Sequence, residues 1–528
     1  MIESRDPITS ELLGQVPEMD AGQVASAIAR SREASRSWSQ LSIDKRCQQM
    51  RLAADTMLDS ADEIVDLICR ETGKTRVDAW TSELLVTAEL IDYYLKHAGR
   101  VLAPRRVTSG TLKTKRASKH YAPLGVVGVI SPWNYPFSLT MTPVVTALFA
   151  GNTVVLKPSE VTPMVGLAAA RIFEATAYPD IVQVVTGGSS TGRCLVAGGV
   201  DKIVFTGSVS TGRLVAIAAA ETLTPVLLEL GGKDPMIVCE DADLDRAANA
   251  AVWGAFTNAG QTCISVERVY AVASVYEDFV KRVAAKAARV RPGKQVGSMT
   301  FPPQLDVVKR QIDDAVRKGA KVLLGGERPA GLSEMFFEPT VLVDVDHTMS
   351  IMTEETFGPV LCIMKVADDA EALAAANDSP YGLSASVFTR SSERRDRLVR
   401  GLAAGSVCVN DCLVNYAIPS LPFGGVKKSG IGRAHGPEGL YELSMVKAVA
   451  EDVTGLSSDP LWFPPRRVFE ALTRRFIQAR YRTKPGARLA GLLSGHQSRN
   501  AADRGLTTLP GTRATAARAS DDAASRGS

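Results

Sequence analysis

Two short segments carry side chains that can make and break covalent bonds. Residues 258–263 end in Cys263, which follows a glycine and small polar residues instead of an apolar stripe. Residues 228–233 contain Glu229. A thiolate attacks carbonyl carbons, and a carboxylate can activate water as a general base. The two segments predict that Cys263 attacks and Glu229 activates water; the alternative is that Cys263 is a structural thiol, as most lone cysteines are.

The elements that must position these two residues alternate along the chain. Short apolar, β-branched runs are followed by helical patterns. Strands are predicted at 125–131, 152–157, 181–185, 202–205 and 225–229, and helices at 140–150, 164–176, 190–197 and 210–221. This alternation is typical of a parallel sheet covered on both faces, which binds ligands at the carboxyl ends of its strands.

A second α/β block is predicted from about 235 to 430. Its strands are expected at 236–239, 267–272, 321–324, 339–343, 360–366, 383–389 and 406–410, and its helices at 243–258, 275–290, 304–318, 367–376 and 391–400. A last strand is expected at 440–451. Before the first block, residues 6–17 read as an extended or hairpin entry, and residues 20–100 are helical, with Asp20 as an N-cap.

Two loops in the first block offer groups for a dinucleotide. Gly207, Ser208 and Gly212 follow a strand and open a helix, where free N–H groups favour a phosphate. The turn lacks the GxGxxG pattern, so a purely structural turn is the alternative. Lys157 and Glu160 come at the end of the second strand of the block, 152–157, and could hold ribose hydroxyls or form a solvated turn. A carboxylate there repels a 2′-phosphate, which favours NAD over NADP.

The loop at 132–137 contains Asn134, whose amide could stabilise a developing oxyanion. For its aromatic residues, Trp133, Tyr135 and Phe137, core packing is the competing interpretation. Residues 105–122 mix basic and hydroxyl side chains without a helical period, which predicts an exposed hairpin. Such a ribbon has unpaired edges, so pairing with another subunit is expected, against the alternative of a solvated loop.

The length and composition of the chain limit which class of protein it can be. A chain of 528 residues is too long for one core, so two or three domains are expected. No run of 18 apolar residues occurs, and the charged N-terminus has no signal-peptide pattern, which predicts a cytoplasmic protein. The eight cysteines are scattered and form no metal-ligand pattern, so reduced thiols and no metal site are predicted.

The net charge of +4 is unevenly distributed. Residues from Ser457 onward carry a net charge of +8, which leaves about −4 on the rest of the chain. That balance argues against nucleic-acid binding. Residues 464–482 form a basic amphipathic pattern that predicts weak contact with a membrane surface, and a solvated or subunit-packing helix is the alternative. Residues 495–528 have a composition typical of disorder.

Seven motifs together resemble the aldehyde dehydrogenase superfamily, over about residues 6–452. They are Pro-Trp-Asn at 132–134, Lys157 with Glu160, Phe-Thr-Gly-Ser at 205–208, Glu-Leu-Gly-Gly-Lys at 229–233, Gly-Gln-Thr-Cys at 260–263, Glu-Thr-Phe-Gly-Pro at 355–359 and Pro-Phe-Gly-Gly at 422–425. Each motif is weak alone, and their common order makes the resemblance specific.

The resemblance implies a role for each matching residue. Cys263 would form a thiohemiacetal and then a thioester, with Asn134 and the Cys263 N–H holding the oxyanion and Glu229 activating the hydrolytic water. Glu229 thereby favours a free acid product over transfer to coenzyme A. The implied contacts with NAD, or with NADP, fall on Trp133, Lys157, Glu160, Gly207, Ser208, Gly212, Glu355 and Phe357.

The resemblance also implies the domain plan. An NAD-binding domain at 1–104 and 123–230, a catalytic domain at 231–433 and an oligomerisation arm at 105–122 and 434–452 are expected, with a basic extension at 457–528. A homodimer or homotetramer follows from the arm.

The resemblance implies an aldehyde substrate but leaves open which aldehyde it is. Residues 291–299, 264–268 and 435–440 are closer to bacterial succinate-semialdehyde-type members, and Arg268 could bind a substrate carboxylate or be structural. A long-chain or aromatic aldehyde, with a membrane-surface C-terminal helix, is the alternative. A catalytically silent scaffold is the alternative outside enzymes.

Overall fold

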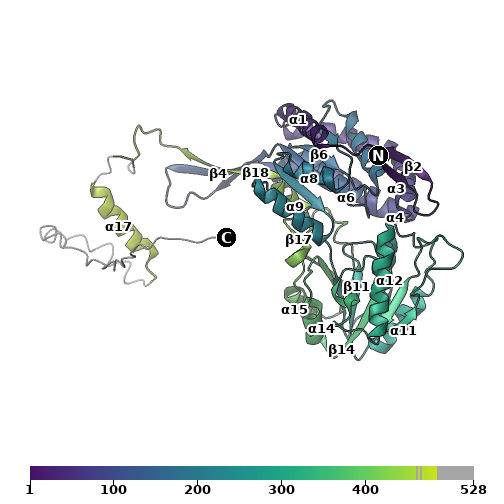
Figure 1. The fold of residues 1–528 in the computed structure, drawn as a ribbon. Helices are drawn as coiled ribbons and strands as arrows, with labels where there is room; N and C mark the ends of the chain where they lie inside the picture. The colour runs from purple at the N-terminus through teal and green to yellow at the C-terminus, as the bar shows by residue number, and fades with distance from the viewer. Residues whose placement is uncertain (460–461, 464–466, 484–528) are drawn as a thin grey trace, which may run out of the picture. The chain divides into compact units, whose positions relative to one another are not determined.

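The computed structural model describes residues 1–459, 462–463 and 467–483. These residues form two compact units. The first comprises Met1–Thr111 and Arg116–Glu451, and the second comprises Leu112–Lys115 and the described residues from Asp452 onward. The first unit contains all the candidate catalytic residues, in two lobes that are each built on a sheet (Figure 1).

The first lobe is built on a six-stranded sheet in the order β17-β9-β8-β5-β6-β7. Its strands are β5 (Val126–Ile130), β6 (Thr153–Lys157), β7 (Val182–Val184), β8 (Lys202–Thr206), β9 (Val226–Glu229) and β17 (Gly430–Ile431). All pairs are parallel except β17 with β9. The predicted parallel α/β sheet is therefore confirmed, with the strands displaced by one or two residues at their ends.

Helices cover both faces of this sheet, because successive side chains of each strand point to opposite faces. Val127 and Val129 pack with one set of helices, and Val126 and Ile130 pack with the other. The first set is α2 (Ile43–Asp59), α3 (Ala61–Thr72), α5 (Leu85–Leu102), α6 (Ser138–Ala150) and α7 (Pro163–Arg171); the second is α1 (Ala21–Trp38), α8 (Ser189–Ala197) and α9 (Val209–Glu221). Asp20 caps α1 through a capping box, as predicted.

The second lobe is built on a seven-stranded sheet in the order β12-β13-β14-β11-β10-β15-β16. Its strands are β10 (Asp234–Val238), β11 (Val266–Val272), β12 (Lys321–Leu324), β13 (Thr340–Val343), β14 (Val360–Val366), β15 (Ser384–Phe388) and β16 (Ser406–Val409). Its helices are α10 (Leu244–Phe256), α11 (Tyr276–Ala287), α12 (Pro302–Arg317), α13 (Ser350–Thr353), α14 (Asp369–Asn377) and α15 (Ser392–Gly401). One continuous apolar core joins them.

The predicted hairpin at 105–122 is present as β3 (Arg105–Val107) paired antiparallel with β4 (Lys115–Pro123). β18 (Ser444–Asp452) adds a third strand beside β4 (Figure 1). The strand expected at 440–451 is wrong at its start, because 440–442 belong to helix α16 (Gly436–Glu442), which has a proline in its first turn. At the N-terminus, β1 (Ile2–Arg5) and β2 (Leu12–Val16) form an antiparallel hairpin, so of the two forms predicted for 6–17 the hairpin is present, but its first strand lies before residue 6.

Short elements complete the first unit. They are α4 (Arg76–Ala79), the π-helix η1 (Trp80–Leu84), and the 3₁₀ turns η2 (Ile172–Ala175), η3 (Thr257–Gly260) and η4 (Lys427–Ser429). The second unit contains α17 (Arg467–Tyr481). Across the described residues, no helix is both long and apolar enough to cross a membrane. The first three residues of the predicted amphipathic segment 464–482, and the whole segment 495–528, lie outside the described residues.

Candidate active site

The carboxyl ends of the first-lobe strands meet at one edge of the sheet and carry most of the predicted site. Trp133 and Asn134 follow β5, and Gly207 and Ser208 follow β8. Glu229 is the last residue of β9, and its main-chain oxygen accepts a hydrogen bond from the Gly207 N–H at 3.0 Å. The edge opens on a cleft of about 1190 Å³. Parallel sheets bind ligands at this edge, so the cleft lies where the sequence predicted it.

Ten of the predicted site residues line this cleft. They are Trp133, Asn134, Lys157, Glu160, Gly207, Ser208, Glu229, Cys263, Glu355 and Phe357. The remaining predicted residue, Gly212, faces the sheet, where an added Cβ would lie 2.4 Å from Leu230 Cδ2. Gly212 therefore lets α9 approach the sheet closely instead of lining the cleft.

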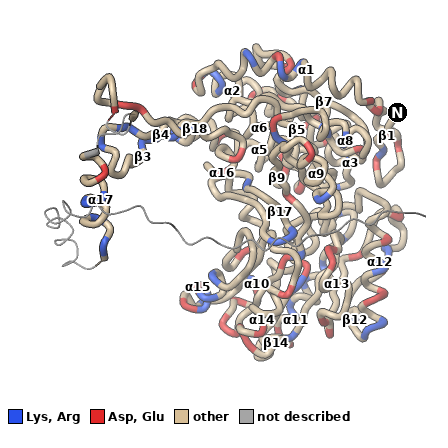
Figure 2. Tube along the Cα trace, turned by 60° about the vertical axis from the view of Figure 1, so that its left-hand side comes forward, with Lys and Arg blue, Asp and Glu red and all other residues tan. Residues whose placement is uncertain are grey.

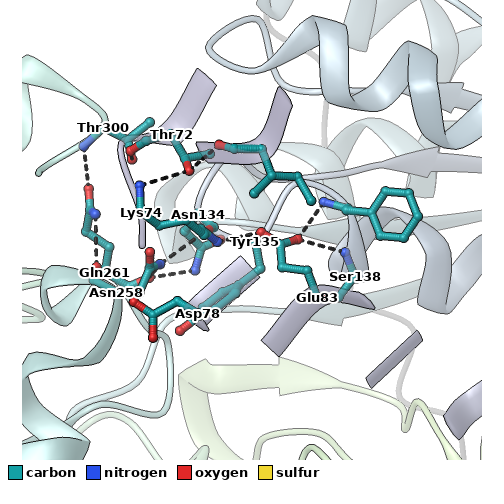
Figure 3. A network of polar contacts seen from close by, with 12 residues as sticks. Thr72, Lys74, Asp78, Glu83, Asn134, Tyr135, Ser138, Asn258, Gln261 and Thr300 are labelled. Carbon is teal, nitrogen blue, oxygen red and sulfur yellow. Dashed lines mark hydrogen bonds and ion pairs between the residues drawn. The ribbon is translucent and has the colours of Figure 1, made fainter. Parts of the chain in front are cut away.

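The nucleophile candidate follows a turn with unusual backbone geometry. Asn258, Ala259 and Gly260 have φ angles of 50°, 54° and 71°. Asn258 and Ala259 are strained in this left-handed region and need support from their surroundings, whereas Gly260 adopts it readily. That support includes side-chain hydrogen bonds from Asn258 and Gln261 within the turn (Figure 3). The turn ends with Cys263 at the cleft, half-buried.

The oxyanion candidate is bonded to this same turn. Asn134 Nδ2 donates to the Gln261 main-chain oxygen at 3.0 Å, and Asn258 Nδ2 donates to the Asn134 main-chain oxygen at 3.0 Å (Figure 3). An amide nitrogen carries two hydrogens, so Asn134 keeps a second one for the cleft that it lines. This arrangement suits a donor held ready for a developing negative charge.

Glu229 is the candidate base. It is buried, and within the described residues neither of its carboxyl oxygens has a hydrogen-bond partner. Burial raises the pKa of Glu229 well above its usual value, while the charge of Arg433 lowers it and that of Glu442 raises it. An unpaired buried carboxyl is costly, and such groups are found where chemistry requires them.

The structure indicates the protonation state of Cys263, which the sequence left open. Burial raises the pKa of the Cys263 thiol above its usual value, and the carboxyls of Asp234, Glu355 and Glu229 raise it further. The sulfur is therefore protonated at neutral pH in the absence of ligands, and it must lose its proton before or during attack.

The cofactor side of the cleft offers groups of the right chemistry for a dinucleotide. The first turn of α9 lines the cleft, with Ser208 capping it through the Thr211 N–H, and a helix N-terminus suits a phosphate. Lys157 Nζ lies 3.1 Å from Glu160 Oε2, and both side chains line the cleft where a ribose diol could bind. Glu355 accepts a hydrogen bond from Gly232 N–H at 3.1 Å, and burial raises its pKa to about 8.

Aromatic rings join the two lobes across the cleft. Trp133 from the first lobe and Phe357 from the second meet edge to face, with ring centroids 5.5 Å apart. Phe357 has a φ of 50°, which marks a second strained position beside the cleft.

The substrate role considered for Arg268 is wrong. Its side chain is fully buried and does not line the cleft. The guanidinium donates to the main-chain oxygens of Lys233 and Ala376 and to the Tyr270 hydroxyl. Arg268 is therefore a structural residue of the second lobe.

The sequence interpretation missed a buried ion pair next to Asn134, formed by Lys74 and Glu83. The segments 44–59, 61–72 and 80–97 looked like helices that cover a sheet and not a site, and Lys74 lies between the last two. The sequence carries no clear signal for the pair, because Lys74 lies between Gly73 and Thr75 and Glu83 follows Ser82, so neither stands among apolar positions.

The fold and cleft define a class of protein. It is a two-lobed α/β protein whose cleft suits a dinucleotide and ends at a cysteine. The chain belongs to the aldehyde dehydrogenase family, whose model matches residues 1–449.

Individual relatives agree with this membership. The chain is 39% identical over 470 residues to the 4,4'-diapolycopene aldehyde oxidase of a Methylomonas species, with 88% of each chain covered. It is 37% identical over 468 residues to a Mycobacterium ulcerans protein named as a candidate NADP(+)-type succinate-semialdehyde dehydrogenase, covering 87% of this chain and 90% of that one. The solved structure of a Mycobacterium tuberculosis aldehyde dehydrogenase complexed with NAD+ matches with a TM-score of 0.81 at 34% identity, covering 85% of this chain and 94% of that one.

Proposed function

We propose that this chain oxidises an aldehyde to a carboxylic acid, with NAD or NADP as hydride acceptor. One observation carries the proposal: Cys263, Glu229 and Asn134 line a single cleft together with the groups suited to a dinucleotide. A family relative has been solved with NAD+ in place, and another carries NADP(+) in its name. Glu160 favours NAD, because its carboxylate repels a 2′-phosphate.

The protein groups divide the reaction into two steps. Cys263 Sγ adds to the carbonyl carbon and its proton passes to water, while Asn134 Nδ2 and the Cys263 N–H hold the oxyanion. The bound cofactor supplies the acceptor for the hydride that leaves this carbon. Glu229 then takes a proton from water as the water attacks the thioester. The carbon–sulfur bond breaks, the acid leaves, and the proton held by Glu229 passes to the departing sulfur, so that the Cys263 thiol is restored. Covalent capture replaces one difficult oxidation by two easier steps.

The remaining predicted residues support the cofactor in this proposal. Lys157 and Glu160 hold the adenosine ribose, Gly207 and Ser208 hold the phosphates, and Glu355 holds the nicotinamide ribose. Trp133 and Phe357 enclose the cofactor from either lobe, and Gly212 shapes the helix that the phosphates face. The domain plan stays a proposal as well: residues 1–104 and 123–230 bind the cofactor, 231–433 bind substrate, and 105–122 with 434–452 form an arm for a homodimer or homotetramer.

An uncharged aldehyde is the favoured substrate class. The lining of the cleft includes Leu139, Thr142, Pro143, Tyr416 and Phe423, which are apolar or hydroxyl-bearing. Arg268, the residue considered for a substrate carboxylate, is occupied elsewhere. A relative named for diapolycopene aldehyde is consistent with an apolar substrate. The rival is succinate semialdehyde, which the name of another relative supports.

Steady-state kinetics test both the proposed oxidation of aldehydes and the proposed substrate class. The panel is succinate semialdehyde, an aliphatic series of increasing length and benzaldehyde, with NAD and with NADP. A higher kcat/KM for longer or aromatic aldehydes is expected, and a preference for the semialdehyde overturns the substrate class. Cys263→Ala is expected to abolish NADH formation. No NADH from any aldehyde, in protein shown to bind NAD, would favour the catalytically silent scaffold.

We also propose a weak membrane-surface contact through α17. Val468, Leu472 and Phe476 are exposed on this helix, and Arg474, Arg475 and Arg480 outnumber its one acid, Glu470 (Figure 2). A basic helix with an exposed apolar face fits an anionic lipid surface. The cytoplasmic location with peripheral membrane contact stays a prediction.

A further inference from the structure

A buried ion pair lies beside the oxyanion candidate and has no part in the reaction described above. Lys74, between α3 and α4, and Glu83, in η1, have side chains with 0% exposure and are joined by a 2.5 Å contact. Burying two charges is expensive, and well-packed apolar residues often serve stability equally well. The pair therefore needs an explanation other than stability alone.

Each partner uses its remaining bonding capacity on one short segment, residues 134–138. Lys74 Nζ donates to the Asn134 main-chain oxygen at 2.8 Å. Glu83 Oε2 accepts the N–H groups of Phe137 at 2.8 Å and Ser138 at 3.0 Å, at the N-terminus of α6. The ion pair thus holds the segment at both ends (Figure 3).

The residue between these ends is held as well. The Lys74 ammonium lies 4.2 Å from the centre of the Tyr135 ring, a cation–π contact. The Tyr135 hydroxyl is 2.7 Å from Thr262 Oγ1, in the residue before Cys263. The main chain of this segment and the side chain of Tyr135 are therefore both fixed relative to the turn that precedes Cys263.

The Asn134 amide is the only group of this segment that the proposed reaction uses. The main-chain oxygen of Asn134 accepts hydrogen bonds from Lys74 Nζ and Asn258 Nδ2. The side-chain amide of Asn134 donates one hydrogen to the main-chain oxygen of Gln261. With these bonds in place, the second amide hydrogen has a fixed direction. An oxyanion donor is effective only when such geometry exists before the charge develops.

We propose that Lys74 and Glu83 are positioning residues that fix Asn134 as an oxyanion donor for the Cys263 adduct. The inference rests on the proposed function and deepens it. Misplacing a catalytic group by about 1 Å costs on the order of 100-fold in rate. The pair acts through Asn134 and does not itself touch the reacting atoms.

A second buried ion pair provides a matched control. Lys233 and Glu267 are also fully buried and bonded to each other. Glu267 accepts the N–H groups of Thr356 at 2.9 Å and Phe357 at 3.1 Å, and Lys233 Nζ donates to Thr356 Oγ1 at 2.8 Å. This pair has the same chemistry but holds the segment on the cofactor side of the cleft.

The experiment compares two charge-neutral double variants of the full-length chain. Lys74→Met with Glu83→Gln removes both charges and keeps an acceptor for α6; Lys233→Met with Glu267→Gln is the counterpart. Three readouts are measured in each: acylation of Cys263 by p-nitrophenyl acetate, alkylation of Cys263 by iodoacetamide, and NAD affinity. Acylation forms an oxyanion and alkylation does not, so their ratio reports on the oxyanion donor and not on general damage to the site.

The first double variant is expected to lose about 10- to 100-fold in acylation rate and kcat. Its alkylation rate and NAD affinity should stay within about threefold, because the thiol and cofactor groups are not held by this pair. The second double variant should show the opposite pattern, with a weaker NAD affinity and a smaller change in acylation. Equal acylation in the first double variant and the unchanged chain would overturn the proposal.

A double-mutant cycle with Asn134→Ala tests the route of the effect. Adding the Lys74 and Glu83 changes to Asn134→Ala should cost less than about threefold further, since the donor they position is already absent. A multiplicative loss would show that the pair acts independently of Asn134 and would overturn the inference. If the double variant does not fold, Lys74→Arg keeps the charge but displaces the donor, and the same acylation-to-alkylation ratio decides.

Failure of the proposed function gives a different result. If the unchanged chain oxidises no aldehyde in the panel, the aldehyde dehydrogenase activity is overturned. The acylation and alkylation rates of Cys263 need neither aldehyde nor cofactor, so they still decide the role of the pair.

Discussion

The side-chain nitrogen of Asn134 lies 3.0 Å from the main-chain oxygen of Gln261, to which it donates a hydrogen bond. This bond joins the loop after β5 in the first lobe to the turn before Cys263, 127 residues further along the chain. The spacing of nucleophile and oxyanion donor is thereby set by a direct contact between the two segments. Changes that move either segment should affect catalysis before they affect the fold.

Gly260 is the position at which the turn before Cys263 least tolerates an added side chain. It has a φ of +71°, and an added Cβ would lie 2.0 Å from the Gly358 main-chain oxygen. Gly260→Ala should therefore lower Tm and reduce kcat by on the order of 100-fold. Gly331, with a φ of +78° and nothing within 4 Å, is the matched control. Gly331→Ala should cost only about 1–2 kcal/mol, from backbone strain, and leave kinetics unchanged. Equal effects of both changes would contradict the packing argument.

Glu229 should give the reaction an acid limb in its pH profile. Burial raises the pKa of this carboxyl well above its usual value, so the base form is lost at a higher pH than for an exposed glutamate. The rate of thioester hydrolysis should therefore rise as pH increases and Glu229 loses its proton. Glu229→Gln should remove this limb, slow hydrolysis by about 10²- to 10⁴-fold and let the thioester accumulate, as detected by mass spectrometry. An unchanged profile in the variant would eliminate Glu229 as the base.

The sequence predicted the sheets because local patterns encode them. The runs at 202–205 and 225–229 are short, apolar and bounded by turns, and they became β8 and β9 with small shifts at the ends. The order of motifs then predicted which residues share the cleft. Gly212 was the exception. A glycine that allows close packing against Leu230 and a glycine that allows close approach of a ligand look the same in a sequence.

Properties that depend on convergence in space could not be predicted. The pKa of Cys263 is raised first by burial and then by the carboxyls of Asp234, Glu355 and Glu229, which come from separate parts of the chain. The role of Arg268 depends on which carbonyl oxygens surround its guanidinium, and the spacing of residues does not specify them. The Lys74–Glu83 pair was missed because its function depends on Asn134, which lies 60 residues away from Lys74.

Glu160 should control the choice between NAD and NADP. Its carboxylate is half-exposed and lies 3.1 Å from Lys157 Nζ. Removing the charge should raise the ratio of kcat/KM for NADP to that for NAD by about tenfold, because repulsion of a 2′-phosphate is lost and a ribose acceptor is removed. The measurement is this ratio for Glu160→Ser. Glu393→Ser, an exposed acid on α15, serves as the control and should not change the ratio.

His435 should make the fold sensitive to acid. Both ring nitrogens lack a partner within the described residues, and the ring packs on Tyr416, with centroids 4.6 Å apart. Burial lowers the pKa of His435 to about 4, below its usual value of 6.5. Because the folded pKa is depressed, stability is fully present above pH 6.5 and falls as the unfolded chain binds the proton.

The loss for His435 should reach about 3 kcal/mol at pH 4. The free energy of unfolding is measured from pH 7 down to pH 4 for the unchanged chain and for His435→Leu. The variant should show a flatter dependence over this range. Parallel curves would contradict a buried neutral imidazole.

The last prediction concerns α17, whose apolar face is exposed within the second unit. Leu472 is 54% exposed and Phe476 is 46% exposed on a helix that carries Arg474 and Arg475. Full-length protein should co-sediment with phosphatidylcholine vesicles that contain phosphatidylglycerol, more strongly at low salt, and not with phosphatidylcholine alone, because both apolar burial and charge attraction are required. Leu472→Glu should abolish binding, since it buries a charge among acyl chains. Gln478→Glu makes the same charge change about 120° around the helix axis from Leu472 and should only weaken binding. Equal loss of binding in both variants would show that net charge alone drives the interaction. Absence of binding by the full chain would exclude α17 as a membrane contact, and so would unchanged binding after deletion of 457–528.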